Sequence, residues 1–242
     1  TILAEAASIE DLVKTFSDPM SGRVNIGLIP TIAPYLLPHI VQPIKKTYPQ
    51  LEIILHEVQT EVMLKQLGEG TLDAGILAVP LETRGIEQII LYNEPFYVAV
   101  NNQHEFAKKS KIIKEDLRGE TLLLLGEGHC LRGQVLEVCS YAMTKERKDF
   151  QDTSLETIRH MVSTGIGITL IPQTAIFSKI LNQNSPIKYI PFSKPAPARS
   201  VGLLFRKNSN RKTCFQNLSD LIQKIIQKKF SIKGSMDIIP VK

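Results

Sequence analysis

Tryptophan is absent from the chain, and only 6% of the 242 residues are aromatic. No dense patch of basic and aromatic side chains occurs either, although the net charge is +5 and part of the basic excess lies near the C-terminus. Proteins that hold nucleic acid place lysine and arginine on the phosphates and aromatic rings against the bases. The composition therefore indicates that this chain does not itself bind nucleic acid.

Long apolar runs are missing too, so no segment reaches the length of a membrane span. Glu5, Glu10 and Asp11 stand where a secretory signal would be basic and then apolar. The chain has three cysteines, an odd number that argues against an extracellular disulfide framework. We therefore expect a cytoplasmic protein without a membrane partner, in whose reducing surroundings any disulfide is transient.

Motifs for metals and nucleotides are also lacking. The segment GEGHC contains two glycines but not the Lys-Ser/Thr pair of a phosphate-binding loop. The histidines share no metal-ligand spacing; they are His39, His56, His104, His129 and His160. We expect no metal and no cofactor.

Two cysteines, Cys130 and Cys139, lie on one short segment, GHCLRGQVLEVC. A glycine-containing turn follows an apolar run and precedes Cys130, an order that predicts a strand, a loop and the start of a helix. The unpaired N–H groups and the dipole at a helix start favour a thiolate over a thiol. His129 and Arg132 are further sources of positive charge. The pattern predicts that Cys130 is a nucleophile.

The spacing of the two cysteines predicts a switch. Cys139 lies nine positions after Cys130 and no proline lies between them, so a helix would place their Cα atoms about 13 Å apart. A disulfide needs Cα atoms within about 7 Å, so bridging would force the segment to unwind. The alternative is two unrelated cysteines, one reactive by accident. Cys214 is expected to be a buried apolar residue rather than a third redox partner.

Strands and helices are predicted to alternate along the chain, which favours an α/β fold with open, mainly parallel sheets covered by helices. The capping box at Thr153–Glu156 opens one helix, which ends at Gly165. Strands are predicted at 24–30, 51–58, 74–78, 86–91, 94–101, 121–125, 168–172 and 201–206. Further helices are predicted at 61–67, at 210–230 and at 32–48, where the prolines suggest irregular turns before regular helix.

Thr31, Thr60 and His129 each follow closely after a predicted strand. Ligands of open α/β sheets bind outside the carboxyl ends of the strands, so these side chains are expected to point into one crevice. The alternative for the threonines is plain helix capping. A thiolate that attacks a peroxide becomes a sulfenic acid and expels hydroxide. The expelled oxygen needs a donor, and the threonine hydroxyls, His129 and Arg199 are suitable.

Several segments resemble the hydrogen-peroxide-sensing members of the LysR-type transcriptional regulators. They are GLIPTIAPYLLPHI, LHEVQT, LYNEPFYVAV, the cysteine segment and TSLETIRHMVSTGIGITLIP, and the likeness extends over about 20–206. The resemblance implies that Cys130 is the peroxidatic and Cys139 the resolving cysteine. It also implies a peroxide pocket formed by Thr31, Thr60, His129 and Arg199. Gly133 departs from the family, which often has an acidic residue there. The sequence does not settle whether this departure changes how the cysteine loop packs or how quickly it rearranges.

The resemblance implies a periplasmic-binding-protein-like fold, with two Rossmann-like α/β subdomains and two crossover connections near Asn93 and Arg199. Subdomain I would comprise 24–92 and 200–230, and subdomain II, which holds the redox cysteines, 93–199. Residues 1–23 would be the end of a linker helix and its lead-in. Residues 231–242 form a tail without a functional signal.

The family also implies the partners of this domain. It would be a non-enzymatic sensor that dimerises, within a homotetrameric activator that binds promoter DNA through a helix-turn-helix preceding Thr1 and contacts RNA polymerase. Peroxide would form the disulfide, the refolding would change the oligomer geometry and transcription, and a glutathione/glutaredoxin-type reductant would reverse it. Two alternatives stay open: a thiol peroxidase, and a LysR-type domain that binds a small organic effector.

Overall fold

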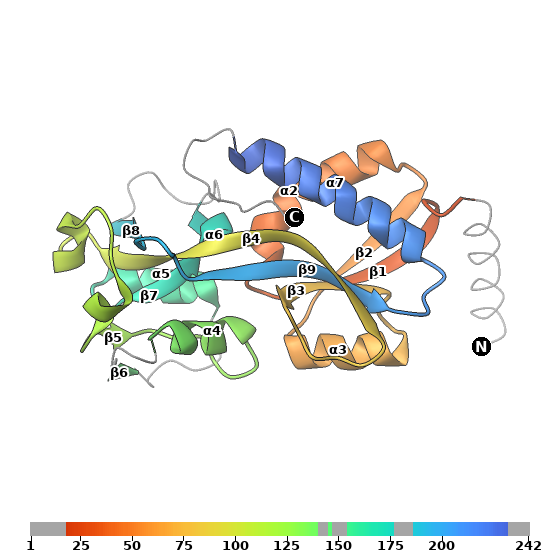
Figure 1. The fold of residues 1–242 in the computed structure, drawn as a ribbon. Coiled ribbons are helices and arrows are strands. Elements are labelled where there is room, and N and C mark those ends of the chain that lie inside the picture. The colour runs from red at the N-terminus through yellow and green to blue at the C-terminus, as the bar shows by residue number, and fades with distance from the viewer. Residues whose placement is uncertain (1–17, 140–144, 147–153, 177–185, 232–242) are drawn as a thin grey trace. The chain divides into compact units, whose positions relative to one another are not determined.

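The computed structural model describes residues 18–139, 145–146, 154–176 and 186–231 (Figure 1). The chain divides into two compact units. Unit 1 contains the described residues of 1–29, 36–92 and 200–242, and unit 2 those of 30–35 and 93–199. No helix within the described ranges is long and apolar enough to cross a membrane.

The sheet of unit 1 is built on β1, β2 and β3, with β9 and β4 following in the order β2-β1-β3-β9-β4. The strand β1 pairs in parallel with β2 and β3, whereas β3 pairs antiparallel with β9. The prediction of a mainly parallel sheet is therefore wrong for the part of the sheet that contains β9. This strand follows unit 2 in the chain and does not follow a helical crossover from a neighbouring strand, so it pairs antiparallel with β3. The bounds are β1 Gly22–Leu28, β2 Leu51–Glu57, β3 Ala74–Val79, β9 Ala198–Arg206 and β4 Ile86–Asn101.

Helices cover both faces of the unit 1 sheet (Figure 1). The helices α2 (Ala33–Thr47) and α7 (Lys212–Ser231) lie on one face, and α3 (Thr60–Glu69) lies on the other. A Cβ atom at Gly75 of β3 would stand only 2.5 Å from the Met63 sulfur, so glycine is needed for the close approach of α3.

Three predictions about helix starts are wrong. The helix α2 is continuous from Ala33 with two prolines inside it, because its apolar face, which includes Leu36 and Ile40, is buried in the core. Thr60 is the first residue of α3 and not its cap, a position that Gln59 occupies. The cap of α5 (Leu155–Ser163) is Ser154, whose hydroxyl accepts from the Thr157 N–H at 3.1 Å; Thr153 lies outside the described residues.

In unit 2, the second part of β4 pairs antiparallel with β7 (Thr169–Pro172) and β8 (Ile187–Pro191). The two strands predicted at 86–91 and 94–101 are thus one strand of 16 residues, and β8 was not predicted. The strand β5 is shorter than predicted and pairs with β6. The remaining elements are β5 Thr121–Leu122, β6 Lys145–Glu146, α4 Cys130–Cys139, α6 Gln173–Ile176 and the 3₁₀ turns Glu105–Lys108 and Lys114–Leu117.

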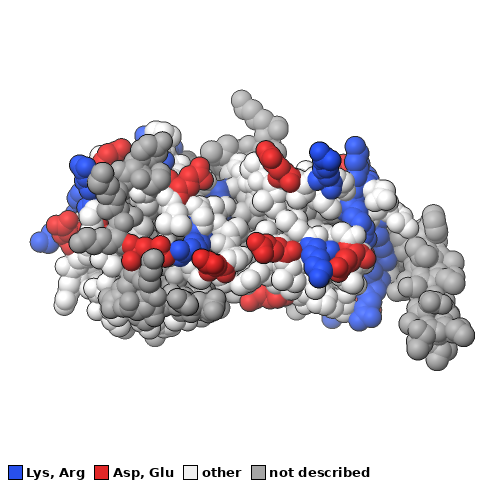
Figure 2. Space-filling view, turned by 90° about the horizontal axis from the view of Figure 1, so that it is seen from below, with Lys and Arg blue, Asp and Glu red and all other residues white. Residues whose placement is uncertain are grey.

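Acidic and basic side chains are interspersed with uncharged ones over much of the face in Figure 2. A row of basic side chains crosses one end of unit 1 in that view. The charges of unit 2 on this face are of both signs.

Candidate functional site

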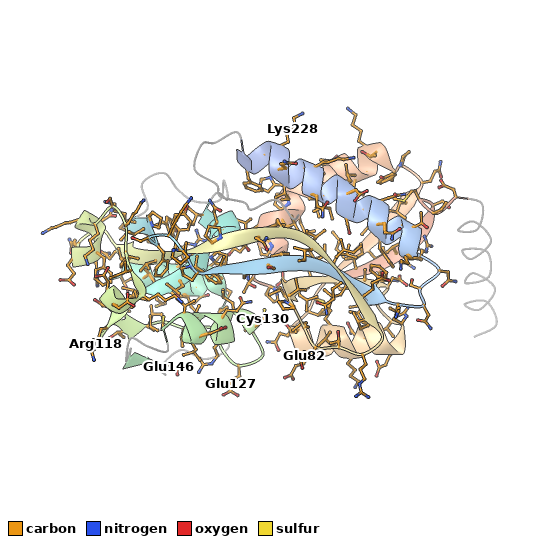
Figure 3. All side chains as sticks on the ribbon, in the orientation of Figure 1. Glu82, Arg118, Glu127, Cys130, Glu146 and Lys228 are labelled. Atoms are coloured by element: carbon orange, nitrogen blue, oxygen red, sulfur yellow. The ribbon has the colours of Figure 1, made fainter. Side chains whose placement is uncertain are left out.

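The two cysteines of the GHCLRGQVLEVC segment are the first and last residues of α4, as the sequence predicted. Cys130 is half-buried and Cys139 is buried, and neither forms a disulfide. Figure 3 labels Cys130 at the start of the helix and Glu127 in the turn before it. In that turn Gly128 has a φ of 85°, which only glycine adopts without strain. Helical geometry over this span places the two Cα atoms about 13 Å apart, beyond the reach of a disulfide.

Cys139 is part of the hydrophobic core of unit 2, with 2% of its surface exposed. Burial raises the pKa of its thiol from 9.0 to about 11. At neutral pH this cysteine is therefore a thiol, and thiols are poor nucleophiles compared with thiolates. It can attack a partner only after it leaves the core, whereas Cys130 is only half-buried.

The burial of Cys139 and of Cys214 on α7 leads to a prediction about alkylation. Burial raises the pKa of Cys214 to about 11 as well. A rise of two units lowers the thiolate fraction at pH 8 about a hundredfold, so iodoacetamide should modify both residues about a hundred times more slowly in the native than in the urea-unfolded protein.

The same pKa values set the direction of the pH dependence of stability. Because the pKa of both thiols is raised in the native state, their contribution to the free energy of unfolding is complete below pH 9. It is lost as pH rises toward 11, because the thiols of the unfolded chain ionise first. Peptide mass spectrometry checks the alkylation rates, and urea denaturation at pH 8 and pH 10 checks the stability. Equal native and unfolded alkylation rates would contradict this description of the core.

Arg132, on the first turn of α4, is held by two contacts within unit 2. Its Nη2 lies 2.6 Å from Oε1 of Glu146, and its Nη1 donates to the Leu125 carbonyl at 3.2 Å. The positive charge that the sequence placed near Cys130 is therefore compensated by a carboxylate. The contacts tie the start of α4 to the segments of β5 and β6.

Two of the four predicted pocket residues, Thr31 and Arg199, contact each other inside unit 2. Nη1 of Arg199 donates to the Thr31 hydroxyl at 3.2 Å, and Nη2 donates to the Thr31 carbonyl at 3.0 Å. Both residues are buried. Thr31 is thus a partner of the guanidinium and not simply a helix cap.

His129 and Thr60 are the other two predicted pocket residues. His129 precedes Cys130 in unit 2, is half-buried and accepts the Arg132 N–H on its carbonyl at 3.0 Å. Thr60 belongs to unit 1. Its hydroxyl oxygen is buried and has no hydrogen-bond partner among the described residues. The structure therefore brings Thr31 and Arg199 into contact and places His129 next to Cys130.

Sequence reasoning missed Glu94, the buried carboxylate that pairs with Arg199. The one signal for it was an acidic residue close before the apolar residues 96–100 of the same strand. A second missed cluster is centred on Arg159, which donates to the Tyr189 hydroxyl and to the Ala175 carbonyl, both at 3.0 Å. This cluster joins α5 to α6 and β8. The described residues contain no group of His, Cys, Asp and Glu suited to a metal ion.

The chain is similar to known proteins over most of its length. Residues 17–226 match the family described as the LysR substrate binding domain. Over 223 residues the chain is 40% identical to the DNA-binding transcriptional dual regulator OxyR of Escherichia coli K12, an alignment that covers 92% of this chain and 72% of that protein.

Solved structures give the same likeness. The crystal structure of the oxidized form of OxyR is 41% identical with a TM-score of 0.78, and the alignment covers 88% of this chain and 100% of that one. The reduced form of the OxyR regulatory domain from Pseudomonas aeruginosa is 36% identical with a TM-score of 0.77, and the coverage is 85% and 99%.

Proposed function

The chain belongs to the family of LysR substrate-binding domains, and on this premise we propose that it is the hydrogen-peroxide-sensing regulatory domain of an OxyR-type transcription regulator. Membership confirms the periplasmic-binding-protein-like α/β fold expected from the sequence. The observation that supports the sensing role best is the placement of the two cysteines at opposite ends of one helix, one half-exposed and one in the core.

The proposed reaction has two steps. The Cys130 thiolate attacks one peroxide oxygen, the O–O bond breaks, Cys130 becomes a sulfenic acid, and the second oxygen leaves as hydroxide, which carries the negative charge into the solvent. The sulfur of Cys139, once out of the core and deprotonated, then attacks the Cys130 sulfur. An S–S bond forms, the S–O bond breaks, and the departing hydroxide takes up a proton as water.

The peroxide pocket is proposed to comprise Thr31, Thr60, His129 and Arg199. Arg199 and Thr31 support this because the guanidinium donates to both the hydroxyl and the carbonyl of Thr31, which holds the two residues together. Thr60 supports it because its buried hydroxyl has no partner within the described ranges. Their task would be to hold the peroxide and to donate to the oxygen that leaves.

We also propose the assembly in which formation of the disulfide changes transcription. This domain dimerises, the longer protein is a cytoplasmic homotetramer, and promoter DNA is bound through a helix-turn-helix that precedes Thr1. Transcription is activated through RNA polymerase, and a glutathione/glutaredoxin-type reductant resets the disulfide. The domain acts as a sensor and not as an enzyme, so we expect slow peroxide turnover, whereas a thiol peroxidase would turn peroxide over rapidly.

The proposal is tested with the reduced protein and one equivalent of hydrogen peroxide, followed by alkylation, digestion without reductant and mass spectrometry. We expect an intramolecular disulfide between Cys130 and Cys139 and an unmodified Cys214. In the Cys139→Ser variant we expect one added oxygen on Cys130 instead, because no resolving thiol is present.

Two results would contradict the proposal. Free thiols at both positions after peroxide treatment would fit a LysR-type domain that binds an organic effector. Rapid, continuing NADPH consumption with peroxide and a thioredoxin or glutaredoxin system would indicate a thiol peroxidase.

A further inference from the structure

Glu94 lies inside β4 and is completely buried. Its Oε1 accepts from Nε of Arg199 at 2.7 Å and lies 2.7 Å from Nη2. Its Oε2 accepts from the backbone N–H and the hydroxyl of Thr174, at 2.9 and 2.6 Å. Both carboxylate oxygens are therefore used by donors of unit 2, so Glu94 is not itself placed to bind a ligand.

Stability alone is a weak reason for such a pair. A buried ion pair contributes little compared with apolar residues of the same size, because both charges must be removed from water. What the pair does provide is a fixed guanidinium. Arg199 is held at Nε and Nη2 by the carboxylate, so the direction of its Nη1 is determined as well.

The direction of Nη1 determines the polarity of the Thr31 hydroxyl. A guanidinium can only donate, and Nη1 lies 3.2 Å from Oγ1 of Thr31. The threonine oxygen must therefore accept from Arg199. No acceptor for its own proton occurs in the part of the chain that the structure describes, so that proton remains available to a ligand.

We propose that Glu94 is the positioning residue of the peroxide pocket. By fixing Arg199 it turns the Thr31 hydroxyl into a donor aimed at the peroxide oxygen that leaves as hydroxide. Glu94 touches neither the peroxide nor the Cys130 sulfur, and it acts only through Arg199 and Thr31. The assignment rests on the proposed function, since it requires Cys130 to react with peroxide.

The test compares two reagents on Cys130. The Glu94→Gln variant keeps the shape of the side chain but removes its charge and presents N–H groups to existing donors. We expect the rate constant of Cys130 oxidation by hydrogen peroxide to fall about a hundredfold, the lower end of the range for loss of one preorganised donor. Alkylation by iodoacetamide, which expels iodide and needs no such donor, should change less than about twofold.

Further variants separate positioning from folding. Thr31→Val should reproduce the selective loss, and adding Glu94→Gln to it should cost nothing more, because both act through one hydroxyl. Thr174→Val removes one donor to Glu94 without deleting the ion pair, and we expect a smaller selective loss. Thr174→Ser is its matched control, keeps the hydroxyl and should react like the unsubstituted protein.

The outcomes distinguish the two proposals. If Cys130 of the unsubstituted protein reacts with peroxide no faster than free cysteine, the proposed function fails. If it reacts fast, but Glu94→Gln and Thr174→Val change the peroxide and iodoacetamide rates in parallel or not at all, the positioning role is wrong and the proposed function stands.

Discussion

Cys130→Ser is expected to abolish the response to hydrogen peroxide. A serine hydroxyl at neutral pH is a far weaker nucleophile than a thiolate, so the rate of peroxide reduction should fall by more than about a hundredfold. The disulfide to Cys139 should disappear entirely. The remaining thiols cannot substitute, because burial raises the pKa of both Cys139 and Cys214 to about 11. Stopped-flow kinetics with peroxide in excess measure the loss.

Cys214→Ser is the matched control for this experiment. It also exchanges a sulfur for an oxygen, but at a fully buried position on α7 in unit 1. We expect it to lose some stability and to keep its peroxide rate constant and its disulfide. Equal responses in the unsubstituted and Cys130→Ser proteins would show that another group reacts with peroxide.

The α4 segment could be predicted from the sequence because its signals are local. A glycine turn, a stretch free of proline and the interval between the cysteines all lie within about a dozen residues. The predicted strands 86–91 and 94–101 failed for the opposite reason. Glu94 was predicted to begin the second of these strands, whereas it lies inside one continuous strand, where Arg199, 105 residues away, pairs with its carboxylate.

The contacts in the predicted pocket also join residues that are far apart in the sequence. The threonines were singled out by position, but the hydrogen bond between Thr31 and Arg199 joins residues 168 positions apart. Nothing local in the sequence predicts that contact. Helix starts were misjudged where neighbouring residues have equal capping chemistry, as with Thr153 and Ser154, since only the backbone geometry decides between them.

We also expect α4 to unwind when the disulfide forms, because its two cysteines lie too far apart in the helix to be bridged. The Cα atoms must approach from about 13 Å to within about 7 Å, which no helix of this length permits. Cys139 and neighbours such as Val135 and Val138 must leave the core, at a cost of roughly 1.5–3 kcal/mol for each large apolar side chain exposed.

One feature of α4 eases this change, and one opposes it. Gly133 lies in the middle of the helix with open space where a Cβ would be, and glycine there lowers helix stability by about 1 kcal/mol relative to alanine. The open space also means that a Cβ atom at this position would meet no other residue. The contact between Arg132 and Glu146 holds the start of the helix in place. When the helix unwinds, either this contact breaks or Glu146 moves together with Arg132.

Amide hydrogen exchange across α4 tests the central claim most directly. In the reduced protein the amides of the second half of the helix should be protected, and after one equivalent of peroxide their protection should fall by at least about a hundredfold. Cys139→Ser, oxidised in the same way, should keep its protection because it forms no disulfide. A peroxide-treated protein with a proven Cys130–Cys139 disulfide and an α4 as protected as before would contradict the account.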